Sequence, residues 1–253
     1  MHNLKPKKHL GQHFLKDQHI AWQIVEQLSA TDQDMVVEIG PGKGILTDVL
    51  VKKYTQLKVV ELDREAVQLL SRRFKPDSIE IIHEDVLKWD LKKNLKADTF
   101  FIGNLPYNIS SPFFFRLLQH IEYVKEGVFM IQKEVAERIC ASKGNKIYGI
   151  LSVLLGAYFQ REYLFSVPPD VFHPPPRVMS GVIKLTRKQP SPSLDFPKLK
   201  TLVKAAFNQR RKRLKNALKT LSISDFEQKE QLLQLRAEQL AIEDFILMAN
   251  YFD

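Results

Sequence analysis

The spacing of hydrophobic positions changes along the chain and marks out its elements. Ile20, Ile24 and Leu28 recur at helical spacing, and after them short apolar runs alternate with amphipathic segments to about residue 141. The predicted strands are Met35–Ile39, Leu57–Leu62, Ile79–His83, Thr99–Gly103 and Val128–Ile131. The predicted helices are Ile45–Tyr54, Arg64–Phe74, Ser111–Ile121 and Glu134–Ala141. Near-continuous apolar strands separated by helices predict a Rossmann-like, doubly wound and mostly parallel α/β sheet.

The pattern beyond residue 146 is different. Residues 147–185 predict another apolar helix, then extended segments around the prolines Pro168-Pro169 and Pro174-Pro175-Pro176, and a last strand at Val182–Leu185. The stretch Arg187–Ser193 has the composition of a linker, and helical periodicity follows it to the end. We therefore predict two domains: an α/β domain over residues 1–188 and a small all-helical domain over residues 195–253.

Size and composition narrow the class of protein. A chain of 253 residues with 44% hydrophobic residues can fill a core, which excludes disorder as its main state. The longest apolar run, Ile147–Phe159, is shorter than the roughly 20 residues that a membrane crossing needs, and the N-terminus lacks the apolar region of a signal peptide. We therefore expect a cytoplasmic protein. With one cysteine, Cys140, and no His-Glu-x-x-His motif, we expect no metal.

The positive charge is concentrated in one stretch. The chain has 38 Lys and Arg against 29 Asp and Glu, a net charge of +9, and Lys198–Lys219 alone holds nine basic residues and no acidic one. A second basic patch consists of Lys5, Lys7, Lys8 and Lys16. This distribution predicts a surface that binds a polyanion on an otherwise neutral protein. The alternative is a solvated helix face.

Three of the ten glycines lie directly after the first predicted strand, in Glu38-Ile-Gly40-Pro-Gly42-Lys-Gly44. Open α/β sheets bind ligands at this end of their strands, and Glu61, at the end of the second strand, could hold two ribose hydroxyls. The dinucleotide fingerprint needs a glycine where Ile45 stands, and no Gly-Lys-Ser/Thr of a phosphate loop follows. The loop therefore favours a nucleoside cofactor over a merely tight turn.

Asp85 follows the third predicted strand and could accept a hydrogen bond from an adenine amino group. By itself it could equally be a solvated or helix-capping acid. Its position in series with Gly40 and Glu61 favours the binding role.

The fourth predicted strand leads into Asn104-Leu-Pro-Tyr107. The exocyclic amine of adenine is a poor nucleophile because its lone pair is delocalised into the ring. If the Asn104 side-chain oxygen and the Leu105 carbonyl each accept one N–H, the lone pair is directed at an electrophile. Pro106 would fix the chain, and Tyr107 would stack on the base. The alternative is an Asn-Pro turn with a packed tyrosine.

Five motifs follow one another along the chain. They are Gly11-Gln-His-Phe-Leu15, Glu38-Ile-Gly-Pro-Gly-Lys-Gly44, Asn104-Leu-Pro-Tyr-Asn-Ile-Ser110, Val171-Phe-His-Pro-Pro-Pro-Arg-Val178 and Phe207-Asn-Gln-Arg-Arg-Lys-Arg-Leu214. Together they resemble the rRNA adenine N6,N6-dimethyltransferase family, and within it the small-subunit branch of kasugamycin-sensitivity dimethyltransferases. The motifs occur in family order over essentially the whole chain, so the set is far more specific than any one of them.

This resemblance implies a methyltransferase domain with S-adenosyl-L-methionine bound across the strand ends. The implied cofactor contacts come from His13, Leu15, Gly40, Glu61, Asp85 and Asn104. The family usually has Asn where this chain has His13, and commonly Asp-Ser-Ala where it has Met179-Ser180-Gly181.

The resemblance also implies that Phe172 covers the target adenine on the face opposite Tyr107. From the residues alone, Phe172 could instead be a hydrophobic plug under the proline-rich loop.

The implied reaction is dimethylation of two adjacent adenosines near the 3′ end of 16S rRNA, in a precursor of the small ribosomal subunit. We expect a monomer that binds RNA through Arg210, Arg211, Lys212, Arg213, Lys215 and Lys219. If Lys198–Lys219 is one helix, its basic residues share a face opposite an apolar one, and these basic residues are Lys200, Lys204, Arg211, Lys215 and Lys219.

Two alternatives stay open at this point. One is a large-subunit rRNA methyltransferase of the macrolide-resistance type, although that branch typically has Ile where this chain has Leu105. The other is a ribosome-assembly factor whose methylation is incidental. The intact Asn104-Leu-Pro-Tyr107 motif disfavours a purely non-catalytic version of it.

Overall fold

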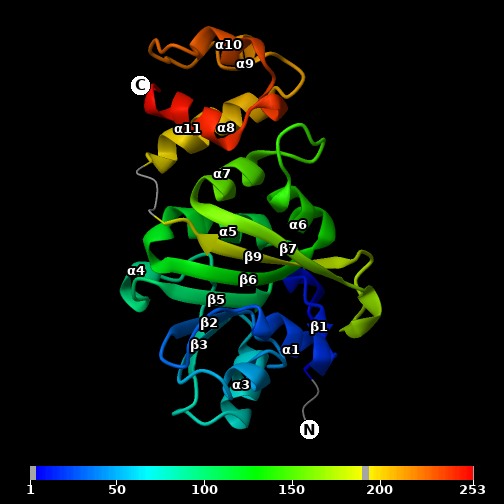
Figure 1. Cartoon of the computed structure of the whole chain (residues 1–253). Coiled ribbons are helices and arrows are strands. Elements are labelled where there is room, and N and C mark those ends of the chain that lie inside the picture. Colours follow the sequence, from blue (N-terminus) through cyan, green and yellow to red (C-terminus); the bar gives the residue numbers. More distant parts are fainter. Residues whose placement is uncertain (1–3, 190–193, 253) are drawn as a thin grey trace. The chain divides into compact units, whose positions relative to one another are not determined.

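The computed structural model describes residues 4–189 and 194–252 (Figure 1). Part of the predicted linker, residues 190–193, lies outside the described residues. The chain forms two compact units: Met1–Ala136 with Glu162–Thr186, and Glu137–Arg161 with Arg187–Asp253. This division differs from the predicted domain boundary, because residues 137–161 group with the C-terminal helices.

A seven-stranded sheet forms the centre of the first unit. Its strand order is β4 (Glu80–His83), β3 (Gln56–Glu61), β2 (Met35–Ile39), β5 (Thr99–Asn104), β6 (Val124–Gln132), β9 (Ser180–Arg187) and β7 (Phe159–Val167). The pairs β4–β3, β3–β2, β2–β5 and β5–β6 are parallel, and β9 is antiparallel to β6. The predicted Rossmann-like parallel sheet is therefore confirmed.

Both faces of the sheet are buried. On one face, Val128 and Met130 of β6 join a core with Ile24 of α1 (Gln18–Glu26) and Leu50 of α2 (Thr47–Leu50). On the other face, Phe129 meets α5 (Ser110–Gln119) through edge-to-face ring contacts with Phe113 and Phe114, at centroid distances of 5.3 and 5.5 Å. Because neighbouring residues of a strand point to opposite faces, burial of both faces requires the continuous apolar strands seen in the sequence.

Helices α3 (Arg64–Arg73) and α4 (Leu91–Asn94) belong to the first unit, and α6 (Lys133–Cys140) spans the division between the two units. The predicted helix Ile45–Tyr54 is longer than the observed α2, because turns flank it on both sides. The sequence pattern did not predict α4.

The N-terminal segment returns to the end of the sheet. After a short 3-10 helix (Lys8–Leu10), β1 (Phe14–Leu15) pairs antiparallel with β8 (Phe172–His173) of the proline-rich loop. This pairing brings two segments that are more than 150 residues apart in the sequence side by side.

The second unit is helical. It contains α7 (Ile150–Tyr158), α8 (Phe196–Asn208), α9 (Leu214–Ala217), α10 (Lys229–Gln234) and α11 (Ile242–Asn250). The apolar helix α7 packs against α8 and α11, which explains why it groups with this unit. Among the described residues, no helix is both long and apolar enough to cross a membrane.

Lys198–Lys219 is not one helix, because α8 ends at Asn208 and the chain turns before α9, so the condition for a shared basic face is not met. In a continuous helix, Arg210 would lie beside Arg213 and Arg211 beside Lys215, and like charges at these spacings are destabilising. The turn also lets Leu214 become fully buried, with its N–H donating to the Leu235 carbonyl at 2.8 Å.

Candidate active site

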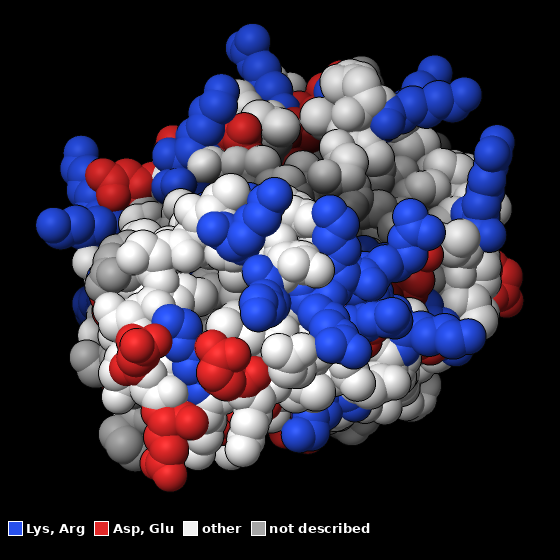
Figure 2. Space-filling model, turned by 90° about the horizontal axis from the view of Figure 1, so that it is seen from above, with Lys and Arg blue, Asp and Glu red and all other residues white. Residues whose placement is uncertain are grey.

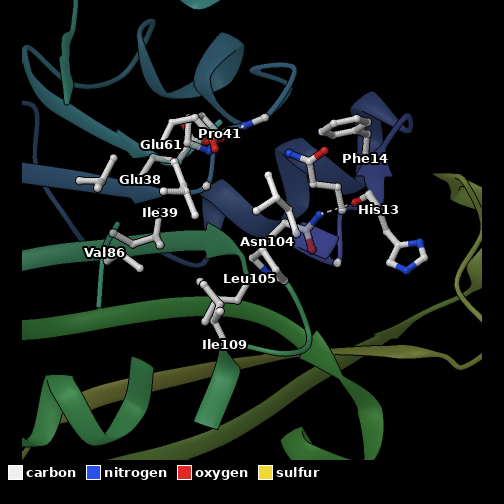
Figure 3. A pocket seen from close by; sticks show the side chains of 18 of the residues that line it. His13, Phe14, Glu38, Ile39, Pro41, Glu61, Val86, Asn104, Leu105 and Ile109 are labelled. Atoms are coloured by element: carbon white, nitrogen blue, oxygen red, sulfur yellow. Dashed lines mark hydrogen bonds between the residues drawn. The ribbon is translucent and has the colours of Figure 1, made fainter. Parts of the chain in front are cut away.

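A pocket opens at the carboxyl ends of the parallel strands (Figure 3). Its lining residues include Gly40 after β2, Glu61 at the end of β3, Asp85 after β4 and Asn104 at the end of β5. Residues 10–15 of the N-terminal segment complete the wall. The strand order reverses between β2 and β5, and this switch point is where doubly wound sheets bind ligands.

The glycine-rich loop requires glycine for its backbone. Gly40, Gly42 and Gly44 have φ angles of 65°, 54° and 79°, in the left-handed region. A Cβ on Gly42 would also lie 2.9 Å from a ring carbon of Phe14, which belongs to β1. The absence of side chains therefore lets the N-terminal segment close against this loop.

Glu61 connects the loop to the next strand. Its side chain is almost fully buried, its Oε2 accepts a hydrogen bond from the Gly42 N–H at 3.0 Å, and its Oε1 accepts one from the Asp63 N–H at 2.8 Å. Burial raises the pKa of Glu61. Because a carboxylate has about four acceptor positions, Glu61 retains the capacity to accept ribose hydroxyls.

Asp85 follows β4 at the end of the sheet, as the sequence pattern predicted, and lies beside apolar residues that line the pocket. Its Oδ1 accepts a hydrogen bond from the Leu87 N–H at 2.9 Å, which fixes the carboxylate. Val86 is buried next to it, and Leu62 lines the pocket with 49% of its surface exposed. A carboxylate can accept a hydrogen bond from the amino group of an adenine, and apolar side chains beside it can pack against the faces of the ring.

Sequence reasoning missed Glu38 as a pocket residue. Glu38 lies near the end of β2, is 1% exposed, and accepts a hydrogen bond from the Thr47 hydroxyl at 2.6 Å. Burial raises its pKa to about 8. An acidic residue inside an otherwise apolar strand was the signal that could have identified it.

Asn104 is held by the N-terminal segment. Its Nδ2 donates a hydrogen bond to the His13 carbonyl oxygen at 3.0 Å (Figure 3). Because a carbonyl can only accept, this contact fixes which end of the amide faces His13 and directs Oδ1 elsewhere. The neighbouring Leu105 N–H donates to the Met130 carbonyl at 3.0 Å, which anchors Leu105 to β6.

Tyr107 is fixed by two contacts that the sequence did not reveal. Its hydroxyl shares a hydrogen bond of 2.8 Å with Ser180 Oγ, and its ring centroid lies 5.5 Å from that of His13. Burial raises the pKa of Tyr107, so the hydroxyl is neutral. Ser180 stands in the segment where this chain departs from the family pattern, and it is fully buried.

His13 and Leu15 both line the pocket. The His13 Nδ1 donates to the Pro174 carbonyl at 2.8 Å, so the ring is tied to the proline-rich loop.

This structure holds the Phe172 side chain in the core, and the role of Phe172 in covering the target base stays a prediction. Phe172 is 1% exposed and belongs to the same core cluster as Leu15, because the pairing of β1 with β8 covers its side chain. The aromatic ring next to Tyr107 is that of His13.

The predicted RNA-binding residues lie on the second unit, and most of them are exposed. Arg211, Lys212, Lys215 and Lys219 are exposed, and Arg213 is exposed with its guanidinium donating to Gln234 at 2.9 Å. Arg210 is half-buried, and its Nε lies 4.0 Å from a Glu238 carboxylate oxygen. Figure 2, which views the molecule from the top of Figure 1, shows Lys and Arg side chains gathered in one area.

Within the described ranges, no group of three or more His, Cys, Asp and Glu side chains could hold a metal ion.

The strand order, the glycine-rich loop and the acidic residues at successive strand ends define a Rossmann-like methyltransferase domain, here accompanied by a small helical unit. The family described as "Ribosomal RNA adenine dimethylase" matches residues 3–253, and the chain belongs to this family.

Similar proteins extend over almost the whole chain. The "Ribosomal RNA small subunit methyltransferase A" of Flavobacterium johnsoniae is 48% identical over 251 residues, which are 98% of this chain and 96% of that protein. The protein of the same name from Parabacteroides distasonis is 49% identical over 222 residues, 87% of this chain and 84% of that protein.

Two solved structures share the fold. A dimethyladenosine transferase from Plasmodium falciparum has a TM-score of 0.82 at 24% identity, covering 95% of this chain and 99% of that one. The 23S rRNA methyltransferase ErmE has a TM-score of 0.72 at 21% identity, covering 94% of this chain and 99% of that one.

Proposed function

We propose that this protein uses S-adenosyl-L-methionine to dimethylate N6 of each of two adjacent adenosines near the 3′ end of 16S rRNA. The observation that carries this proposal is the fixed Asn104 amide, whose Nδ2 is bound to the His13 carbonyl, at the switch point of the sheet. Relatives named small-subunit methyltransferases, at 48% and 49% identity, favour the small subunit over the large-subunit alternative.

The pocket residues fit the proposed cofactor by their chemistry. Glu61 would hold the ribose hydroxyls, Asp85 the adenine amino group, and Gly40 would lie against the methionine part. His13 and Leu15 would close the pocket from the N-terminal side. When bound, S-adenosyl-L-methionine supplies a methyl group attached to a positively charged sulfur. That sulfur is an activated leaving group, so the methyl group can be transferred.

The residues at the end of β5 would act on the adenine. Asn104 Oδ1 and the Leu105 carbonyl would each accept one N–H of the exocyclic amine, so that the nitrogen becomes pyramidal and its lone pair is available. Tyr107 would stack on the base, with its ring held by the bond to Ser180. The stacking would retain an extruded nucleotide with about 1 to 3 kcal/mol.

The exposed cations Arg211, Lys212, Arg213, Lys215 and Lys219, together with the half-buried Arg210, would contact phosphates of the ribosomal RNA. The proposed substrate is a precursor of the small ribosomal subunit in the cytoplasm, bound by a single copy of the chain.

Tritiated S-adenosyl-L-methionine tests this function when it is offered with hypomethylated 30S particles, 50S particles and free RNA. We expect label in the 30S particle, mapped to N6 of two adjacent adenosines near the 3′ end of its RNA. Label confined to 50S particles would support the large-subunit alternative. Binding to 30S particles with no label on the RNA would support an assembly factor.

A further inference from the structure

The Asp63 carboxylate is the point at which the N-terminal segment is attached to the sheet. Its side chain is fully buried, with 0% exposed. Its Oδ1 accepts from Lys7 Nζ at 2.6 Å and from the Glu65 N–H at 3.0 Å, and its Oδ2 accepts from Gln12 Nε2 at 3.0 Å. Burial acts to raise the pKa of Asp63, but the hydrogen bonds from Lys7 and Gln12 outweigh it, so its pKa lies below the usual value and the group is ionised.

Capping of a helix does not require this arrangement. Asp63 is the N-cap of α3, a role that uses the Glu65 N–H alone. Asp90 is the N-cap of α4 and accepts from the Lys93 N–H at 3.2 Å, and its side chain is at the exposed surface. The two additional donors on Asp63 both come from the N-terminal segment, which is more than 50 residues away in the sequence.

A continuous series of contacts leads from Asp63 to Asn104. Gln12 donates to Asp63, and its Oε1 accepts from the Lys7 N–H at 2.8 Å, so both ends of the Gln12 amide are fixed. The next residue, His13, presents its carbonyl to Asn104 Nδ2 at 3.0 Å. Asp63 also donates its own N–H to Glu61, so one turn holds the proposed ribose acceptor and the attachment of the N-terminal segment.

We propose that Asp63 is a positioning residue for methyl transfer, acting through Gln12 and the His13 carbonyl to hold the Asn104 amide with Oδ1 toward the adenine amine. This inference rests on the proposed function, because it assigns Asn104 Oδ1 to the reacting nitrogen. The physical reason is that a hydrogen-bond acceptor accelerates the reaction only when its direction is fixed, and an error of about 1 Å can cost up to about 100-fold in rate.

The variant Asp63→Ser separates positioning from capping. Serine is a good N-cap, so α3 keeps its cap, but its side chain is too short to reach Lys7 and Gln12. The matched control is Asp90→Ser, which makes the same change at a cap that is hydrogen-bonded to Lys93 and Asn94 of its own helix. Gln12→Ala removes the hydrogen bond from Gln12 to Asp63 and so breaks the same series of contacts. It replaces Asp63→Ser in the test if Asp63→Ser does not fold.

Two measurements test the proposal. In the protein without cofactor, NMR reports hydrogen exchange of the Asn104 side-chain amide, which we expect to be slow in the wild type and at least about tenfold faster in Asp63→Ser. At saturating S-adenosyl-L-methionine, the single-turnover rate of methyl transfer should fall at least about tenfold, while binding of 30S particles changes less than about twofold. The double variant of Asp63 and Gln12 should be no slower than Asp63→Ser alone, because both changes break one series.

An Asp63→Ser variant with a wild-type rate at saturating cofactor and unchanged Asn104 exchange would overturn the proposal, even if its Tm falls as in Asp90→Ser. A loss confined to cofactor affinity would also overturn it. These outcomes require an active wild-type protein. A wild type that binds cofactor and 30S particles but transfers no methyl group would instead refute the proposed function and this inference with it.

Discussion

At the scale of single residues, two buried carboxylates at the strand ends differ in their donors. Asp63 binds the Lys7 ammonium and has a lowered pKa, whereas Glu38 binds the neutral Thr47 hydroxyl and has a pKa raised to about 8. A buried charge is stable when a cation and several donors surround it, and otherwise the protonated form is favoured. Glu38 in β2 and Asp63 at the start of α3 thus differ in charge near neutral pH.

Replacing Asn104 by alanine should reduce methyl transfer about 100-fold or more, because the variant lacks one aligned acceptor in the transition state. Cofactor affinity should weaken but stay measurable, because the change also removes the hydrogen bond to His13. Turnover of labelled cofactor with hypomethylated 30S particles measures the rate, and calorimetry measures the affinity. Near wild-type turnover in a folded variant would refute the assignment of Asn104.

Glu38 should make the stability of the unliganded protein depend on pH. Its pKa rises from the usual value of 4.5 in the unfolded chain to about 8 in the fold, so the folded state binds more protons between these pH values. The free energy of unfolding should therefore fall as pH rises from 5 to 8, by about 3 kcal/mol from this group. Glu38→Gln should remove this slope.

Urea unfolding of the wild type and of Glu38→Gln at several pH values measures their free energies of unfolding. The difference between the two proteins isolates the contribution of Glu38 from that of the other titrating groups. Parallel pH profiles for the two proteins would show that Glu38 is ionised in the folded state.

At the scale of elements, close packing decides which segments form units. Helix α7 is apolar on nearly all sides, and its Gly156 allows close approach of α11. A Cβ at Gly156 would overlap Ile242 Cδ1 and would lie 2.6 Å from Arg161 Cζ. Arg161 in turn donates to the carbonyls of Ile139 and Ser152, at 2.9 and 2.5 Å. The glycine therefore serves packing within the second unit.

Gly156→Ala should lower the free energy of unfolding by about 1 to 3 kcal/mol, because the new methyl group must displace both Ile242 and Arg161. This loss should exceed the gain of about 1 kcal/mol in helix propensity. The matched control is Gly149→Ala, where φ is −164° and the nearest atom to a new Cβ is 3.8 Å away. Thermal unfolding compares the two variants, and a Tm of Gly156→Ala at or above that of the control would contradict the prediction.

At the scale of the whole molecule, charge and pocket are divided between the units. The pocket is lined by residues of the first unit, and the basic residues 210–219 belong to the second. The chain as a whole carries +9. Binding of RNA by an exposed charged surface weakens as the salt concentration rises. Interactions inside a pocket are screened less, so binding and reaction there depend little on salt.

Changing Arg211, Lys215 and Lys219 to Glu should weaken binding of 30S particles and reduce the slope of log affinity against log salt by about one unit for each phosphate that the variant no longer neutralises. Cofactor affinity should stay near the wild-type value, because the pocket residues are unchanged. The matched control reverses three exposed lysines of the first unit, Lys92, Lys93 and Lys96. Titrations of 30S particles at several salt concentrations measure the slope of log affinity against log salt for each protein. Equal slopes in the wild type and the triple variant would show that the basic stretch is a solvated surface.

The sequence by itself determined the α/β order, the parallel strands and the residues at their ends. Strands buried on both faces must be continuously apolar, so the runs around Val36, Val59 and Phe101 could be recognised without any tertiary information. The pocket residues Gly40, Glu61, Asp85 and Asn104 follow from the same rule, because the carboxyl ends of parallel strands meet at one edge. The local hydrophobic pattern and the order of neighbouring elements are sufficient to predict these strands and the residues at their ends.

Only the tertiary structure decided how the side chains at that edge are used. The pairing of β1 with β8 buries Phe172, and the turn after Asn208 divides the expected basic helix. The attachment of Gln12 to Asp63 and the bond from Asn104 to His13 join residues that are 51 and 91 positions apart. No local periodicity encodes such contacts, because a hydrogen bond or a buried contact between distant segments depends on the path of the whole chain between them.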